Sequence, residues 1–345
     1  MGGGVHFSNF TDAFKRIVTF DSVVEEADPV NPEQYREACL SSQRDDINIH
    51  FMPYPLEHPL QGRNILWGIF EYTEAPRIFL DFYKDMNCRL FWTPSVWGKQ
   101  ILCKAGVPAG KIYVVPEGVN PNLYHPYFRA SNPRQSRYHF LTIGKLEERK
   151  SYKELLQAFR KAFDNDPNVH LYCKADFFNP SIETYHAKQI ELLTLIDTLG
   201  LTNVQCLCGE ADLRSMLSIY TGCDAFLYPT KGEGWGLPLI DAIACGLPVI
   251  TTNHSGHTEF IRHLSASLVP VEYDLTPVGG NDPGLWASPR VDSIARGLKY
   301  CYENREWLAH EAIRASSIIR NRFSWDQAAI KAMDSLIAHG LFKIQ

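Results

Sequence analysis

The chain has 345 residues, of which 45% are hydrophobic and 21% are charged. This length favours two domains with separate hydrophobic cores, and the composition excludes a largely disordered chain. The formal net charge of -5, without any Lys- or Arg-rich block, excludes nucleic acid as an expected partner.

The first part of the chain alternates between helical and strand-like patterns, which is typical of α/β proteins with parallel sheets. The expected helices lie at residues 9–16, 32–40, 77–86 and 95–105. The expected strands lie at residues 17–20, 47–52, 64–70, 89–93 and 111–115. A Pro-, Asn- and Arg-rich stretch at residues 125–137 has no apolar periodicity, so we expect an interdomain linker there.

A second strand-helix series follows the linker and indicates a second Rossmann-like sheet. Its expected strands lie at residues 139–144, 169–175, 204–209, 223–229 and 248–252. Its expected helices lie at residues 151–163, 183–199, 211–220 and 238–245, and residues 291–342 are expected to be largely helical. The two domains are therefore expected at residues 1–130 and 137–324.

The cysteines and the lengths of the apolar stretches indicate in which cellular compartment the protein is expected. The nine cysteines form no CxxC pair, which favours reduced thiols. No stretch approaches the roughly 18 apolar residues of a membrane span, and the first residues do not resemble a signal peptide. A cytoplasmic protein with no transmembrane segment is expected, and peripheral membrane contact stays open.

The most informative stretch is residues 230–250, TKGEGWGLPLIDAIACGLPVI. A strand ends here, a loop with three glycines follows, and a helix begins with Pro238 in its first turn. Glycines let backbone N–H groups approach a ligand, and the helix start adds a positive dipole end, so the loop suits a diphosphate. Glu233 within the loop suits sugar hydroxyls, and Asp241 suits a ribose diol. The alternative is a tight strand-to-helix turn with a capping carboxylate.

Residues 233–261, EGWGLPLIDAIACGLPVITTNHSGHTEFI, resemble the donor-site signature of the group 1 family of retaining glycosyltransferases, which have the GT-B fold. That signature is EGFGLPxxEAMAxGxPVIxxxxGGxxE, and here Ser255 replaces the first glycine of GGxxE. The resemblance implies that Glu233 holds the transferred sugar and that Asp241, in place of the second Glu, holds the ribose. The backbone implied to bind the donor phosphates is that of Gly234, Trp235, Gly236 and Leu237.

A second signature lies at residues 142–159, TIGKLEERKSYKELLQAF, and resembles the family's VGRLxxxKGxxxLIxAF. In the family the Arg and the Lys of this pattern neutralise the donor diphosphate. The resemblance places Lys145 at the Arg position and Lys150 at the Lys position. Lys keeps the charge of Arg but not its bidentate geometry. A solvated run of charges on a helix is the alternative.

Other segments of the chain resemble the same family less specifically. Glu210 and Ala211 correspond to a segment near the donor base. Gly3 and Gly4 correspond to a glycine-rich loop facing the phosphates, with a flexible terminus as the alternative. Glu71 stands where the family often has a His beside the donor sugar, and it could equally cap a helix.

Together these resemblances imply two Rossmann-like domains with parallel sheets facing a central cleft. The last helix, about residues 325–345, is implied to pack back on the first domain. The implied reaction is retaining transfer of a sugar from a nucleoside-diphosphate sugar to a hydroxyl acceptor, without metal or other cofactor. The implied catalytic residues are Glu233, Lys145, Lys150 and Glu71. The alternatives are a sugar-nucleotide epimerase or phosphorylase, or a non-catalytic nucleotide-sugar binder.

Overall fold

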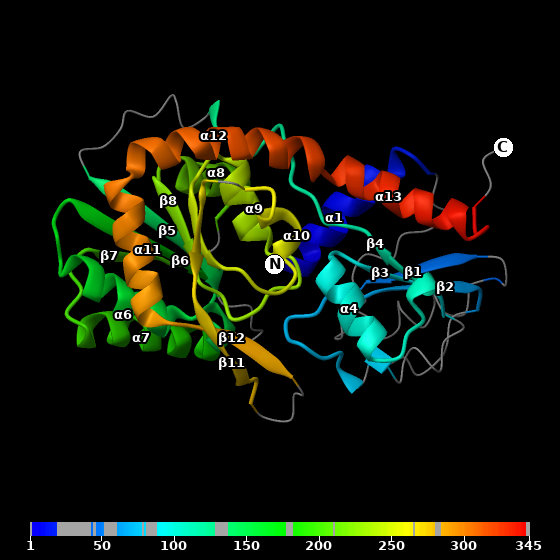
Figure 1. The fold of residues 1–345 in the computed structure, drawn as a ribbon, viewed down its shortest axis with the longest axis horizontal. Helices are drawn as coiled ribbons and strands as arrows, with labels where there is room; N and C mark the ends of the chain where they lie inside the picture. Colours follow the sequence, from blue (N-terminus) through cyan, green and yellow to red (C-terminus); the bar gives the residue numbers. More distant parts are fainter. Residues whose placement is uncertain are drawn as a thin grey trace. The chain divides into compact units, whose positions relative to one another are not determined.

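The computed structural model describes residues 2–18, 43, 46–51, 61–77, 79–80, 88–127, 137–176, 182–209, 211–264, 266–279 and 284–342. It divides into two compact units. Unit 1 comprises Met1–Gly118, Val278–Gly284 and Phe323–Gln345, and unit 2 comprises Val119–Pro277 and Leu285–Arg322. Figure 1 shows the elements of both units.

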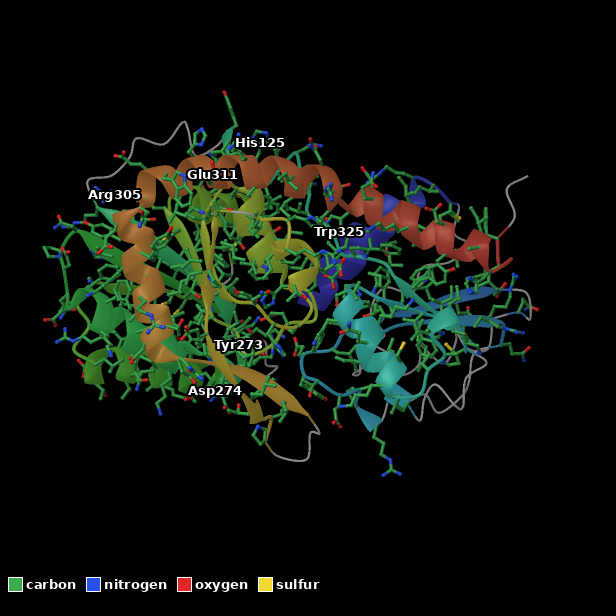
Figure 2. All side chains as sticks on the ribbon, viewed as in Figure 1. His125, Tyr273, Asp274, Arg305, Glu311 and Trp325 are labelled. Carbon is green, nitrogen blue, oxygen red and sulfur yellow. The ribbon has the colours of Figure 1, made fainter. Side chains whose placement is uncertain are left out.

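Unit 1 contains a parallel sheet with strand order β1-β2-β3-β4. Its strands are β1 (Ile47–Phe51), β2 (Arg63–Trp67), β3 (Cys88–Thr93) and β4 (Ile112–Val114). Its helices include α1 (Gly2–Lys15), α4 (Val96–Lys104), the 3-10 turn η1 (Ala109–Lys111) and α13 (Trp325–Ala338). The start of α13 can be followed in Figure 2, where Trp325 is labelled.

The core of unit 1 is aromatic. Trp67 of β2 and Trp92 of β3 meet edge to face with ring centroids 5.3 Å apart, and Phe10 of α1 packs edge-on against Trp67 at 4.6 Å. Trp92 Nε1 donates a hydrogen bond to Ser335 Oγ of α13 at 2.9 Å. Segments from the two ends of the chain, α1 and α13, therefore pack on the same sheet.

Unit 2 contains a parallel six-stranded sheet with order β10-β9-β8-β5-β6-β7. Its strands are β5 (Tyr138–Lys145), β6 (Val169–Asp176), β7 (Val204–Leu207), β8 (Ala225–Tyr228), β9 (Val249–Thr252) and β10 (Leu268–Val271). Its helices are the 3-10 turn η2 (Glu148–Lys150), α6 (Tyr152–Phe163), α7 (Ile182–Thr198), α8 (Leu213–Thr221), α9 (Leu237–Ala244), α10 (Thr258–Ile261), α11 (Val291–Glu303) and α12 (Arg305–Arg322). An antiparallel hairpin of β11 (Tyr273–Pro277) and β12 (Leu285–Pro289) lies outside this sheet, and Figure 2 labels Tyr273 and Asp274 on it.

The middle of the sheet of unit 2 is buried, as is typical of parallel sheets covered by helices: nearly all residues of β5, β8 and β9 are buried. Leu155, Leu156 and Phe159 of α6 are fully buried, and Phe159 meets Phe140 of β5 with ring centroids 6.2 Å apart. Each such side chain contributes roughly 1.5–3 kcal/mol when buried. This core holds fixed the strand ends that carry the candidate site.

Two expectations at the start of the chain are wrong. Gly3 and Gly4 lie in the first turn of α1 and not in a loop. The amides of Ile17 and Val18 donate to the carbonyl of Phe14, so these residues close the end of α1 instead of starting a strand. The rest of that expected strand, the helix at 32–40, part of the helix at 77–86 and most of the linker fall outside the described residues.

Candidate functional site

The glycine-rich loop of unit 2 joins β8 to α9. Gly236 is the N-cap of α9 with a φ of 96°, a left-handed conformation that favours glycine. Pro238 follows in the first turn of the helix, as the sequence predicts. The loop is buried throughout residues 229–236. Its backbone is therefore held in one conformation at the start of a helix.

A second loop, which follows β9, is hydrogen-bonded to the glycine-rich loop. Ser255 Oγ accepts a hydrogen bond from the Glu233 amide at 2.8 Å, and the Gly256 amide donates to the Glu233 carbonyl at 2.8 Å. A Cβ on Gly256 would lie 1.8 Å from the carbonyl oxygen of Gly234. Only glycine fits at this close approach of two backbones.

The two carboxylate oxygens of Glu233 have different hydrogen-bonding environments. Oε1 accepts hydrogen bonds from three donors within 2.8 Å, which are Arg149 Nη1 at 2.8 Å, Lys150 Nζ at 2.6 Å and Thr230 Oγ1 at 2.7 Å. Oε2 accepts no hydrogen bond from the described residues. One oxygen thus anchors the side chain, and the other has no hydrogen-bond partner among the described residues.

The charge of Glu233 is maintained by these neighbours. Burial acts to raise its pKa, because the side chain is only 6% exposed and desolvation disfavours the charged form. The charges of Arg149 and Lys150, with the hydrogen bonds from Lys150 and Thr230, outweigh burial and lower the pKa from 4.5 to about 2. Glu233 is therefore a carboxylate at neutral pH.

The two lysines of the second signature have different environments. Lys150 is buried, its Nζ donates to the Tyr228 hydroxyl at 2.7 Å, and it lies 4.9 Å from the centre of that ring. A Cβ on Gly144 would come within 3.3 Å of the Lys150 side chain. Lys145 is 39% exposed, and its Nζ lies 3.8 Å from the Glu147 carboxylate. The structure thus joins Lys150 directly to Glu233, whereas Lys145 pairs loosely with Glu147.

Arg149 is a site residue that the sequence did not reveal. It lies in η2, its side chain is 9% exposed, and it donates to the Gly232 carbonyl at 2.7 Å as well as to Glu233. Its Nη2 also lies 3.2 Å from Glu147. In the run KLEERK it resembled one more solvated charge, so its pattern carried no signal of burial.

Asp241 lies in α9 and is half-buried. Burial raises its pKa well above the ordinary value, and a hydrogen bond with Tyr124 opposes that shift. The Asp241 carboxyl is thus linked to the Tyr124 side chain, which comes from the segment after β4. After Arg149, Tyr124 is the second residue of the site that the sequence did not reveal. It lies more than a hundred residues before Asp241, in an irregular segment.

The other expected site residues are more dispersed. Trp235 is buried, with its ring 5.0 Å from that of Phe260, and Leu237 begins α9. Ala211 is half-buried just before α8, and Glu210 falls outside the described residues. Glu71 is half-buried in a bend of unit 1 after β2, and Gly3 and Gly4 belong to α1 of the same unit.

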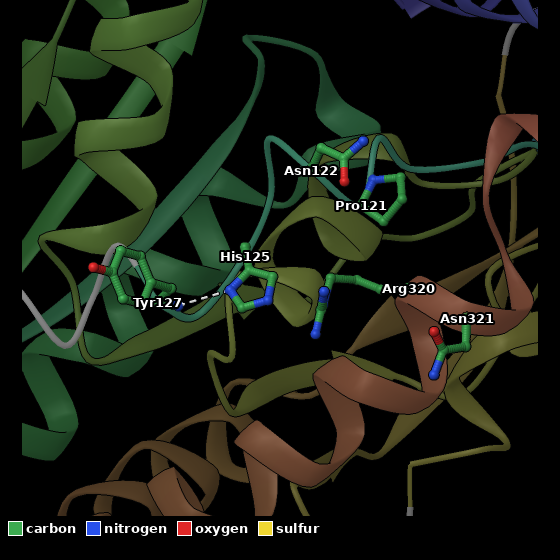
Figure 3. A pocket seen from close by; sticks show the side chains of 6 residues that line it. All are labelled: Pro121, Asn122, His125, Tyr127, Arg320 and Asn321. Atoms are coloured by element: carbon green, nitrogen blue, oxygen red, sulfur yellow. Dashed lines mark hydrogen bonds between the residues drawn. The ribbon is translucent and has the colours of Figure 1, made fainter.

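A hollow elsewhere in unit 2 is distinct from this loop (Figure 3). Its lining comes from the segment after β4 and from the end of α12, and comprises Pro121, Asn122, His125, Tyr127, Arg320 and Asn321. None of the site residues expected from the sequence is among them. Among the described residues, no cluster of three or more His, Cys, Asp or Glu side chains could hold a metal ion, and no helix is both long and apolar enough to cross a membrane.

Two serines with positive φ allow a paired prediction. Ser151, at 55°, stands where the family pattern has glycine, and its buried Oγ has no hydrogen-bond partner among the described residues. Replacing it with glycine should raise the free energy of unfolding by about 0.5–1 kcal/mol, because relief of roughly 1–2 kcal/mol of strain in the folded state exceeds the entropy cost of glycine.

Ser255, at 65°, carries the same strain, but its Oγ binds the buried Glu233 amide. The change Ser255→Gly should destabilise the protein, because an unsatisfied buried N–H costs about 1–3 kcal/mol. Urea unfolding of wild type and of both variants measures the change in the free energy of unfolding that each substitution causes. If Ser151→Gly and Ser255→Gly changed it in the same direction, the role given to the Ser255 hydroxyl would be contradicted.

Comparison with known families matches residues 126–316 to the family described as glycosyl transferases group 1. A putative glycosyltransferase 45 of the Sulfolobus islandicus filamentous virus is 25% identical over 207 residues, which cover 59% of this chain and 52% of that protein. Mannosylfructose-phosphate synthase of Agrobacterium fabrum is 24% identical over 217 residues, covering 61% and 47%. The chain thus spans about half the length of these curated relatives.

Solved structures resemble the fold over a larger share of the chain. A glycosyltransferase from Rickettsia africae matches with a TM-score of 0.69 at 15% identity, covering 100% of this chain and 95% of that one. Anabaena Alr3699/HepE in complex with UDP and glucose matches with a TM-score of 0.65 at 18% identity, covering 80% and 72%. Together with the parallel sheets described above, these similarities confirm the expected α/β class and GT-B fold.

Proposed function

Because the chain belongs to the glycosyl transferases group 1 family, we propose that it transfers a sugar from a nucleoside-diphosphate sugar to a hydroxyl acceptor, with retention of configuration. The observation that supports this most is the arrangement of Glu233. Its Oε1 is fixed by three donors while Oε2 is left to accept a sugar hydroxyl. The carboxylate lies in a glycine-rich loop at a helix start, beside the buried cation of Lys150.

Unit 2 is proposed to bind the donor. The backbone N–H groups at the start of α9, with Lys150 and Lys145, would hold the diphosphate, as helix starts and cations do for phosphates. Asp241 would form a hydrogen bond with a ribose hydroxyl. A UDP-sugar is the first donor to test, because the similar Anabaena structure holds UDP and glucose. Unit 1 is proposed to bind the acceptor.

The proposed chemistry depends on stabilising the leaving diphosphate. Breaking the bond between the anomeric carbon and the diphosphate leaves positive charge on the sugar and negative charge on the phosphate oxygens. Preorganised N–H groups and lysine cations stabilise that developing negative charge. The departing diphosphate takes the acceptor's proton as the acceptor attacks the same face of the sugar, which gives retention. We propose that these cationic groups make a divalent metal unnecessary.

The test is incubation of the full chain with sugar nucleotides, UDP-glucose first, and with sugar acceptors, in the presence and absence of excess EDTA. We expect nucleoside diphosphate release and a glycoside that keeps the donor's anomeric configuration, equally in EDTA. Abolition of transfer by EDTA would contradict metal independence. An inverted product would contradict retention.

Two other activities are outcomes of the same test. An isomerised sugar nucleotide formed without acceptor would identify an epimerase, and sugar transfer to or from inorganic phosphate would identify a phosphorylase. Thermal stabilisation by a sugar nucleotide without transfer to any acceptor would identify a binder. A ligand at about a hundred times its Kd should add about 2.7 kcal/mol of stability, which makes binding measurable separately. A cytoplasmic location stays a prediction from the sequence.

A further inference from the structure

Arg149 connects η2 to the glycine-rich loop through both its backbone and its side chain. Its carbonyl accepts a hydrogen bond from the Lys231 amide at 2.8 Å and lies 3.1 Å from Thr230 Oγ1, the hydroxyl that donates to Glu233. Its guanidinium donates to the Gly232 carbonyl at 2.7 Å and to Glu233 Oε1 at 2.8 Å. Arg149 is therefore held in a fixed position relative to the carboxylate.

Two cations thus share one buried carboxylate. Arg149 and Lys150 both lie within 2.8 Å of Glu233 Oε1, and all three side chains are less than a tenth exposed. When a buried carboxylate loses its partner cation, the folded protein is destabilised by several kcal/mol, because neither water nor another charge takes the place of the cation. If Lys150 alone neutralised Glu233, binding a diphosphate through Lys150 would weaken that pairing.

We propose that Arg149 is a positioning residue that neutralises and orients Glu233, so that the charge of Lys150 is available to a nucleoside diphosphate. This inference rests on the proposed function. Arg149 and Thr230 hold Oε1 whether or not Lys150 does, so the free edge of the carboxylate, Oε2, keeps its direction when the donor binds. Arg149 itself acts through Glu233 and does not need to touch the substrate.

Lys231 offers a matched control, because it connects the same two segments without contacting Glu233. Its side chain is 7% exposed, and its Nζ lies 3.0 Å from Glu148 and 3.3 Å from Glu154. Glu148 is 74% exposed and Glu154 is 24% exposed, so each keeps some contact with solvent when Lys231 is replaced. Replacing Lys231 tests the loss of a bridge between η2 and the loop while leaving the charge around Glu233 unchanged.

The experiment measures the affinity for UDP, GDP and ADP by calorimetry in wild type, Arg149→Met, Lys231→Met, and each of these combined with Glu233→Gln. Arg149→Met should weaken diphosphate binding by about tenfold or more, the loss expected when a charged hydrogen-bond partner is removed. Adding Glu233→Gln should restore most of that affinity, because it removes the carboxylate that then competes for Lys150. Such non-additivity is the sign of direct coupling.

In the Lys231→Met background, Glu233→Gln should change the affinity by the same factor as in wild type. If Glu233→Gln changed the diphosphate affinity by the same factor in the Arg149→Met and Lys231→Met backgrounds, the inference would be overturned. Arg149 would then be only a structural bridge between η2 and the loop. If Arg149→Met does not fold, the double variant with Glu233→Gln is measured in its place. Recovery of folding and binding there supports the inference, and a double variant that stays unfolded overturns it. A wild-type chain that binds none of the three diphosphates would instead refute the proposed function.

Discussion

The change Glu233→Gln is expected to lower sugar transfer by roughly 10- to 150-fold while nucleoside diphosphate affinity is undiminished. Three donors converge on Oε1, so the amide oxygen of glutamine must take that position. The amide NH2 then replaces Oε2 and presents a donor where the sugar hydroxyl needs an acceptor. The variant therefore loses the contact to the sugar but keeps the cations that bind phosphate.

Calorimetry with UDP and transfer assays on the same preparations separate the two effects. Glu148→Gln is the control, since Glu148 is a mostly exposed acid on the adjoining turn that pairs with Lys231 and not with the Glu233 cluster. The control should keep both binding and transfer. Unchanged turnover in Glu233→Gln would remove Glu233 from the reaction.

The sequence predicts that Lys150 and Glu233 belong to one donor site, although 83 residues separate them, but it does not predict their ion pair. Both follow strands of one parallel sheet, and neighbouring parallel strands end at the same edge, where such folds bind ligands. The structure has β5 and β8 as neighbours. The two signatures therefore lie side by side because these two strands are neighbours, whereas the repeated strand-helix pattern predicts only that both strands belong to one parallel sheet.

The role of Arg149 could not be predicted, because it depends on a local turn rather than on periodicity. In a regular surface helix, successive residues point to different sides, and a charged residue such as Arg149 is expected on the side that faces solvent. Here η2 is a single 3-10 turn that ends at Ser151 in a left-handed conformation, and this turns Arg149 inward. Nothing in the letters KLEERK distinguishes the buried Arg149 and Lys150 from the more exposed charges before them.

The antiparallel hairpin β11–β12 and the contact of Asp241 with Tyr124 were missed for a different reason. Both depend on pairings between segments without a strong pattern of their own. The strands of the hairpin are five residues each and include exposed and half-exposed residues, so they lack the nearly complete burial of β5, β8 and β9. Tyr124 follows the last strand of the first sheet in an irregular segment, where a single tyrosine carries no positional signal.

Lys150→Ala is expected to weaken nucleoside diphosphate binding by roughly 10- to 150-fold, the effect of removing one charge-assisted hydrogen bond. The environments of the two lysines predict unequal effects. Lys150 is 9% exposed, so its charge acts in a poorly screened site, whereas Lys145 is 39% exposed and its charge is screened by solvent and salt. Lys145→Ala should therefore cost less, and its effect should shrink as salt is raised.

The measurement is UDP affinity for both single variants and the double variant at low and high salt, with UMP as the matched ligand. If both lysines bind one diphosphate, the double variant should depart from additivity, because groups that share a partner are coupled. UMP has one phosphate fewer, so its affinity should fall less in every variant. Folding should persist in Lys150→Ala, since Arg149 and Thr230 still neutralise and hold Glu233. Unaltered UDP affinity in both single variants would mean that other groups neutralise the diphosphate.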